Sequence, residues 1–189
     1  MMERFHYAYM QTNTPVGILL LGASGRGLCL LSFASRMERP AFAKNSPFAG
    51  EWVESQSELA PYVHELQQYF AGERKQFEMP LDLRGTDFQR KCWQALVDIP
   101  YGETCCYADI ARQVDSPKGF RAVGMANNRN PIAIVVPCHR VLGADGSLWG
   151  YGGGLSAKEF LLKLEGAAFK VPTEKALAND RYAQESLFA

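Results

Sequence analysis

The spacing of apolar residues changes along this 189-residue chain, and the change limits the folds that are open to it. Between residues 5 and 33, two short apolar runs, Val16 to Leu21 and Leu28 to Phe33, flank the sequence Ala-Ser-Gly-Arg-Gly. Runs on both sides of such a turn predict two strands of a small antiparallel sheet. From residue 57 onward, apolar residues recur every three or four positions, as they do in helices. Strands followed by helices indicate an α+β protein.

Residues 1–80 are predicted to form a small N-terminal α/β domain. Behind the two strands, the stretch from Ala34 to Glu51 is rich in Ser, Pro, Ala and charged residues, which predicts a surface loop. A helix is expected from Ser57 to Phe70, closed by Ala71-Gly72. Its apolar face consists of Leu59, Val63, Leu66 and Phe70.

Residues 81–169 are predicted to form a second, mainly helical domain. Thr86 and Gln89 make a capping box that opens its first helix. A short second helix is marked by Tyr107, Ile110, Ala111 and Val114. A third is expected from about Pro117 to Asn127, with Ser116 as its N-cap. The second and third helices have the layout of a helix-turn-helix, although antiparallel helix pairs are also common.

The last predicted helix opens at a capping box formed by Ser156 and Glu159 and ends at Gly166. Residues 170–189 then follow as a tail. Glu165 falls in the last helical turn, where the helix dipole disfavours a negative charge by ~0.3–1 kcal/mol. Either another group holds this carboxylate, or it is an ordinary solvated glutamate.

The net charge of zero excludes a protein that is basic all over, but it leaves a local basic patch open. The segment from 112 to 140 holds one acid, Asp115, and five basic residues, Arg112, Lys118, Arg121, Arg129 and Arg140. Small side chains such as Ala122 and Gly124 would let the third helix approach a DNA groove closely. The alternative is a helix packed tightly on the protein core, with Arg121 solvated.

Five cysteines without any C-x-x-C spacing argue against a disulfide framework and against a zinc knuckle. Cys29 and Cys92 are expected to be small buried hydrophobes. The apolar run from Gly17 to Gly22 is too short to span a bilayer, and no secretory signal pattern begins the chain. We therefore expect a cytoplasmic protein.

Cys138 is the candidate nucleophile. Asn130-Pro131 ends the third helix, and Ile132 to Val136 are expected to form a short apolar strand that delivers the thiol. A free thiol is only a few per cent ionised at neutral pH, so an attacking cysteine needs a base or a positive field. His139 is the candidate base. Because neighbours on an extended chain point to opposite sides, we expect it to act through a bridging water.

These segments closely resemble the O6-alkylguanine-DNA alkyltransferases, the methylated-DNA–protein-cysteine methyltransferase family, over residues 80 to 168. The segments that carry the resemblance are Arg121-Ala122-Val123-Gly124, Asn130-Pro131-Ile132, Ile134 to Val141, Gly150-Tyr151, Gly153-Gly154, Lys158 to Leu162 and Glu165-Gly166. The N-terminal part resembles the family only in its strand pattern and in Tyr69-Phe70-Ala71-Gly72.

The resemblance implies DNA repair. The alkyl group of O6-alkylguanine, or of O4-alkylthymine, would move irreversibly to Cys138 in a single turnover, without a cofactor. His139 and a water would form the proton path, and Glu165 would orient His139. Asn130 would connect the groove helix to the active site. Tyr107 would offer its hydroxyl to the leaving guanine.

We further expect a monomer that binds double-stranded DNA through the minor groove. By resemblance the third helix enters the groove, and Arg121 fills the stack as the damaged base flips into the pocket. The expected DNA-binding residues are Arg121, Ala122, Gly124, Arg129 and Lys118. The expected pocket residues are Val141, Trp149, Tyr151 and Gly152, and main-chain groups of Cys138, Val141 and Gly152 would read the base edge.

The sequence departs from the family in two places within its body. Trp149 stands where a small residue is usual, which predicts a narrower pocket that favours methyl over benzyl adducts; the alternative is a side chain that turns outward. Some relatives carry zinc in the N-terminal domain, but this chain offers only Cys29, His6 and His64 as ligands there. No structural metal is therefore expected.

Two other classes of function fit the sequence less well. A non-catalytic lesion sensor would keep the groove helix, but relatives of that type replace the cysteine, and Cys138 is present here. A Cys–His hydrolase would attack acyl groups with the same thiol, but its local signatures are absent and its histidine would lie far away in sequence.

The C-terminal sequence Gln184-Glu185-Ser186-Leu187-Phe188-Ala189 resembles the short peptide by which bacterial replication and repair proteins dock on the sliding clamp. Two apolar residues at an otherwise polar terminus favour a clamp tether, formed by Gln184, Ser186, Leu187 and Phe188. The alternative is that the two apolar side chains fold back onto the body.

We predict that replacing Leu187 and Phe188 by alanine abolishes capture of the protein by the sliding clamp, because the apolar anchors of the peptide are lost. A pull-down with purified clamp measures this. Unchanged capture of the double variant would contradict the tether.

Overall fold

The computed structural model describes residues 2–11, 13–34 and 47–170. The first part of the chain forms a four-stranded sheet in the order β3-β2-β1-β4. Its strands are β1 Arg4–Met10, β2 Leu19–Ser24, β3 Gly27–Phe33 and β4 Glu51–Glu54. β2 pairs antiparallel with β1 and with β3, whereas β4 runs parallel to β1. The predicted α+β class is confirmed, and the sheet is antiparallel except at β4.

The two predicted strands correspond to β2 and β3. β2 begins three residues later than predicted, because Gly17, with a φ of +89°, lies in the turn before it. The apolar pattern does not indicate β1 or β4. β1 mixes exposed, half-buried and buried positions, and β4 has no fully buried residue, so neither is marked by an uninterrupted apolar run.

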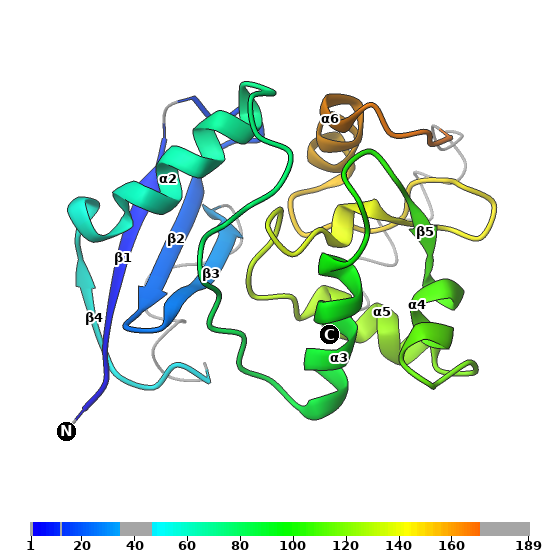
Figure 1. The fold of residues 1–189 in the computed structure, drawn as a ribbon, viewed down its shortest axis with the longest axis horizontal. Coiled ribbons are helices and arrows are strands. Elements are labelled where there is room, and N and C mark those ends of the chain that lie inside the picture. Colours follow the sequence, from blue (N-terminus) through cyan, green and yellow to red (C-terminus); the bar gives the residue numbers. More distant parts are fainter. Residues whose placement is uncertain (1, 12, 35–46, 171–189) are drawn as a thin grey trace.

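Helix α2, Gln56–Phe70, packs on β1 and β2 (Figure 1). The Ser55 hydroxyl caps it by accepting a hydrogen bond from the Glu58 amide, so the helix starts one residue earlier than predicted. Its end near residue 71 is confirmed, with Gly72 at a φ of +75°. Tyr69, one residue before the predicted apolar position 70, is the fully buried aromatic of this helix.

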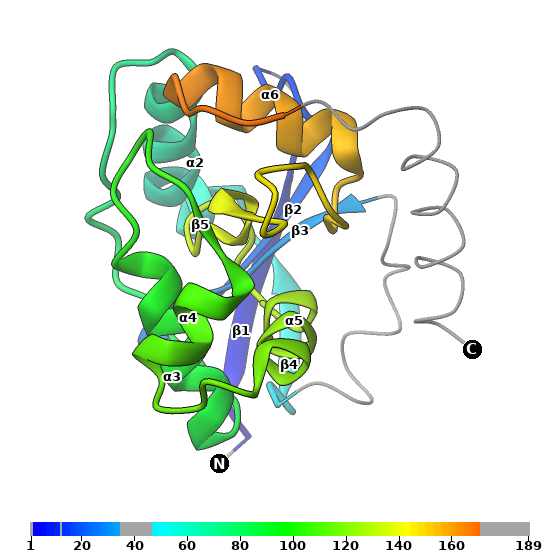
Figure 2. The ribbon, with the colours of Figure 1, turned by 90° about the vertical axis from the view of Figure 1, so that its right-hand side faces the viewer.

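The second part of the chain is mainly helical. Its elements are α3 Asp87–Val97, β5 Cys105–Cys106, α4 Tyr107–Gln113, α5 Phe120–Asn128, the 3-10 helix η2 Cys138–Arg140, β6 Val141–Leu142 and α6 Leu155–Glu165. Helices α3, α4 and α5 pack on one another, and β5 pairs parallel with β6 (Figure 2). The capping box of Thr86 and Gln89 and the predicted pair of short helices, α4 and α5, are confirmed.

Two predicted helix starts are wrong. The helix predicted from Pro117 begins at Phe120, because the Ser116 carbonyl accepts a hydrogen bond from the Gly119 amide (2.7 Å) in a turn that precedes it. Helix α6 begins at Leu155, directly after Gly154. Ser156 therefore lies inside the helix, and the capping box predicted there does not form. Both starts have a glycine N-cap without a side-chain hydrogen bond.

The strand predicted from Ile132 to Val136 is also wrong. Only Ile132 makes a β-bridge, to Leu31, and the following residues form turns in which Ile134 has a φ of +73°. The chain thus curls rather than extends before the cysteine. Cys138 consequently lies at the start of η2 and not at the end of a strand.

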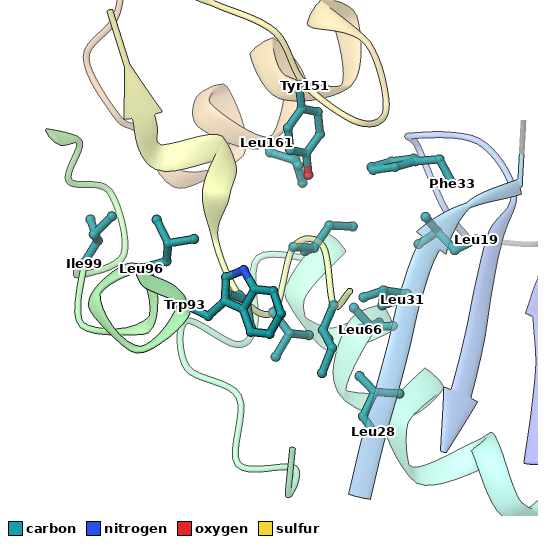
Figure 3. Packing of buried hydrophobic residues seen from close by; sticks show 14 of the residues in the cluster. Leu19, Leu28, Leu31, Phe33, Leu66, Trp93, Leu96, Ile99, Tyr151 and Leu161 are labelled. Carbon is teal, nitrogen blue, oxygen red and sulfur yellow. The ribbon is translucent and has the colours of Figure 1, made fainter. Parts of the chain in front are cut away.

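The largest hydrophobic core joins the two parts of the chain (Figure 3). Leu31 and Phe33 from β3, Leu66 from α2, Trp93 from α3 and Tyr151 from the glycine-rich loop all belong to it. Backbone pairing also joins the two parts, because β3 bridges through Leu31 to Ile132, in the segment that precedes Cys138. A domain boundary near residue 80 therefore stays a prediction.

No helix in the described ranges is long and apolar enough to cross a membrane. Most of the loop predicted from Ala34 to Glu51 lies outside the described residues, and so does the tail beyond Lys170 with its clamp motif. The clamp tether therefore stays a prediction.

Gly27, the first residue of β3, is held against the chain that links the two parts. Its φ is +140°, and a Cβ built there would lie 2.3 Å from the Pro80 carbonyl oxygen. We predict that Gly27→Ala lowers the free energy of unfolding by roughly 2 kcal/mol, through backbone strain and this clash. Gly25→Ala is the matched control, because nothing lies within 4 Å of its Cβ position. Equal denaturation midpoints for the two variants would contradict the prediction.

Candidate active site

Asn130 holds the segment that carries Cys138. Its side-chain amide donates to the Val136 carbonyl (2.8 Å) and to the Cys138 sulfur (3.3 Å), and its Oδ1 accepts from the Ile132 amide (3.0 Å). Asn130 follows the C-cap of α5 by one residue. One side chain therefore fixes the curled segment, contacts the sulfur and ties both to the end of α5.

The Cys138 thiol is partly buried, and burial raises its pKa. The hydrogen bond from Asn130 and the nearby Lys158 ammonium oppose this rise without reversing it. The thiol is therefore neutral at rest, and attack on an electrophile requires a group that takes its proton.

His139 is completely buried and can serve as that group. Its Nε2 lies 2.9 Å from Glu165 Oε1. Since a carboxylate only accepts hydrogen bonds, Nε2 carries the proton and Nδ1 keeps a free lone pair. Burial lowers the pKa of His139 despite the neighbouring Glu165, and Nδ1 has no hydrogen-bond partner among the described residues. The imidazole is thus neutral and basic at Nδ1.

Glu165, the last residue of α6, is buried and fully engaged. Besides His139 it accepts hydrogen bonds from the Tyr69 hydroxyl (2.7 Å) and from Arg140 Nε and Nη2 (2.8 and 2.9 Å). Burial alone would raise its pKa, but the hydrogen bonds from His139 and Arg140 lower the pKa of Glu165 to about 2. The prediction that another group holds this carboxylate against the helix dipole is confirmed.

Arg140 corrects the predicted basic patch. It is buried, with its guanidinium on Glu165 and on the Ile99 carbonyl (2.6 Å), so it adds nothing to the surface charge. Arg112 is on the surface but pairs with Asp109. The patch of the described surface is thus reduced to Lys118, Arg121 and Arg129, which are all exposed.

Lys158 is a site residue that the sequence reasoning did not single out. Its side chain is completely buried, and its ammonium donates to the carbonyls of Val141 and Trp149, each at 2.7 Å. It thereby holds the strand after the cysteine and the start of the glycine-rich loop together. Its position among the buried residues Ala157, Leu161 and Leu162 of α6 is the signal that could have revealed it.

Tyr151 and Trp149 differ in where their side chains lie. Tyr151 is buried, and its ring contacts His139 and Phe33 at centroid distances of 6.3 and 5.5 Å. Trp149 is 41% exposed, and its indole nitrogen donates to the Ser147 hydroxyl (2.9 Å). This favours the outward-facing alternative for Trp149 over a wall that narrows the pocket.

The remaining predicted residues lie in β6, in the glycine-rich loop, in α4 and in α5. Val141 is buried directly after η2, and Gly152 is half-buried in the loop. Tyr107 opens α4, and its ring lies 3.9 Å from the position of a Cβ on Gly124 of α5. Arg121 and Ala122 are exposed on α5. The structure thus joins Cys138 to Asn130 at the end of α5, and it joins His139, the next residue in the chain, to Glu165.

The other predicted cysteines behave as expected. Cys29 and Cys92 are both completely buried, and burial raises the pKa of Cys29 to about 12. Within residues 2–11, 13–34 and 47–170, no three His, Cys, Asp or Glu side chains are grouped so as to hold a metal ion.

The fold and the site define a class of protein in which a partly buried cysteine lies close to a pair of short helices, α4 and α5. Comparison with known proteins gives the family. The DNA-binding domain of 6-O-methylguanine DNA methyltransferase matches residues 87–167, and the ribonuclease-like domain of the same family matches residues 5–83. The chain belongs to the 6-O-methylguanine DNA methyltransferase family.

Relatives and solved structures agree with this assignment. A methylated-DNA–protein-cysteine methyltransferase from Methanosarcina acetivorans is 47% identical over 159 residues, which is 84% of this chain and 98% of that protein. One from Mycobacterium leprae is 48% identical over 153 residues, covering 81% and 88%. The crystal structure of Mycobacterium tuberculosis OGT in complex with DNA has a TM-score of 0.76 at 45% identity, covering 85% of this chain and 92% of that one.

We predict that Glu165→Gln lowers the free energy of unfolding by roughly 3 kcal/mol, because the change leaves the Arg140 guanidinium buried without its counter-charge. Glu159→Gln on the same helix is the control, since its carboxylate pairs with Lys163 at the surface and should cost less than about 1 kcal/mol. The loss should be full above the ordinary glutamate pKa of 4.5 and shrink as the pH falls toward about 2, because the pKa of Glu165 is lowered in the folded state. Denaturant titrations at several pH values measure this. A pH-independent difference would contradict it.

Proposed function

We propose that this protein repairs DNA by moving the alkyl group of O6-alkylguanine, or of O4-alkylthymine, onto Cys138 in a single turnover. Membership of the methyltransferase family supports alkyl transfer from DNA to a cysteine. The observation that carries the choice of Cys138 is its setting: a partly buried thiol that accepts from Asn130 and precedes a histidine whose far nitrogen is bound to Glu165.

The reaction follows from these protonation states. The thiol proton passes through a water to Nδ1 of His139, and the thiolate attacks the alkyl carbon. The new S–C bond forms as the C–O6 bond breaks, and the electron pair of that bond stays on the base. The guanine then takes up one proton, for which the Tyr107 hydroxyl is the proposed donor. The thioether is stable, so the protein is consumed and needs no cofactor.

The buried carboxylate of Glu165 supports the proton transfer. When Nδ1 accepts the proton, a positive charge appears on a fully buried ring, which is costly without a counter-charge. Glu165 lies 2.9 Å from that ring and stays ionised because its pKa is about 2. The Arg140 guanidinium pairs with the Glu165 carboxylate and balances its charge while His139 is neutral. The cluster is thus charge-balanced at rest and stabilises the imidazolium when it forms.

We assign DNA binding to the outer face of α5, which would enter the minor groove of duplex DNA. Arg121 would fill the place of the extruded base, and the small residues Ala122 and Gly124 would allow close approach. Lys118 and Arg129 would contact phosphates. Main-chain groups of Cys138, Val141 and Gly152 would read the edge of the flipped base. We propose that a monomer is sufficient for this.

A non-catalytic lesion sensor remains the alternative that a direct experiment separates from repair. After incubation with a duplex that contains one O6-methylguanine, we expect intact-protein mass spectrometry to show the gain of one methyl group, and peptide mapping to place it on Cys138. Cys138→Ala should gain none, whereas Cys105→Ala should react like the unchanged protein. Binding of the duplex without any gain in mass would replace the enzyme by the sensor.

A further inference from the structure

The outer face of α5 has one long apolar side chain in the middle of its basic residues. The exposed residues of this helix and its C-cap are Phe120, Arg121, Ala122, Met125, Asn128 and Arg129. At about 100° per residue, Met125 falls at the centre of the arc that Arg121 and Arg129 border, one helical turn from each. Met125 is 53% exposed, so its thioether side chain points into solvent rather than into the core.

The segment of the chain that carries Met125 has charges of one sign. Between Ser116 and Ala144 the sequence contains no aspartate or glutamate, while Lys118, Arg121 and Arg129 are exposed within this segment. An apolar centre with a cationic border complements a groove that has partly apolar sugar walls between two anionic rims and that can open at a base step. The minor groove of duplex DNA has this character, since sugars and base edges lie between two rows of phosphates.

The neighbours of Met125 leave room for such an approach. Ala122 precedes it by three residues and Gly124 by one, so two of its neighbours toward the start of the helix have no long side chain, and the long neighbour on that side is Arg121, one turn away. The Arg121 guanidinium lies 6.0 Å from the centroid of the Phe120 ring, at the first turn of α5. Met125 is therefore the long apolar group that projects from the middle of this face.

We propose that Met125 acts as an apolar wedge in the minor groove, inserted at the base step next to the extruded nucleotide. Minor-groove proteins insert such side chains between base steps, which partly unstacks and kinks the duplex. The wedge would lower the cost of base extrusion and add affinity that does not depend on salt. This inference rests on the proposed function. It adds a residue whose contribution to binding depends on how easily the duplex unstacks at one base step.

The test uses the full chain with Cys138→Ala, so that binding is measured without reaction. The probe is a duplex with one O6-methylguanine and a fluorescent 2-aminopurine at the adjacent step. We expect Met125→Ala to weaken binding about tenfold at every salt concentration and to reduce the fluorescence rise, because burial of a methionine side chain is lost. Met125→Leu should restore both signals.

Two control variants make the result specific. Arg129→Gln should lower the slope of log affinity against log salt by about 0.9, because one phosphate contact is lost. Val97→Ala removes an exposed apolar side chain of α3 (40% exposed) and should change nothing. The wedge is overturned if Met125→Ala binds within twofold of the parent, changes the salt slope, or weakens binding with an unchanged fluorescence rise. Loss of methyl transfer to Cys138 in the unchanged chain would overturn the proposed function instead.

Discussion

The site depends on one buried carboxylate, Glu165, that accepts hydrogen bonds from three side chains of two other elements. Tyr69 reaches it from α2, His139 and Arg140 from η2, while Glu165 itself ends α6. Such a carboxylate would be costly to bury alone, and it is stable because its hydrogen bonds and the Arg140 charge compensate the lost water. The contact between Glu165 and Nε2 of His139 fixes the imidazole ring. The tautomer of His139 and the free lone pair at Nδ1 follow from that contact.

A second constraint acts on the thiol from the other side. The β3 edge strand bonds to the curled segment twice, from the Leu31 amide to the Pro131 carbonyl (2.8 Å) and from the Ala133 amide to the Leu31 carbonyl (2.9 Å). Asn130 then binds Val136 and the sulfur within that curl. Neither Cys138 nor His139 is therefore placed by its neighbours in sequence alone. The relative position of the Cys138 thiol and the His139 imidazole is set by the sheet on one side and by α6 on the other.

Local sequence signals predicted much of the site but not its connections. Cys138 and His139 are adjacent in the chain, the role of Asn130 comes only from the family resemblance, and the charge of Glu165 conflicts with its place at a helix end. Tyr69 belongs to a segment that resembles the family, but it stands 96 residues from Glu165, so its contact with the carboxylate follows only from the fold. Arg140 looked like surface charge because one sequence cannot show burial. The strand expected before Cys138 was wrong for a related reason, since a β-branched apolar run does not reveal the positive φ of Ile134.

These connections bear on what the N-terminal sheet contributes. A fragment that began at residue 81 would lose the phenol of Tyr69 from the Glu165 carboxylate and the strand edge of Leu31 from its cysteine segment at the same time. The segment from Asn130 to Cys138 would keep its internal hydrogen bonds but would lack the β3 strand on which it packs. The N-terminal sheet thus supplies the backbone partners against which the segment before Cys138 takes its curled shape, and these contacts remain in the folded protein.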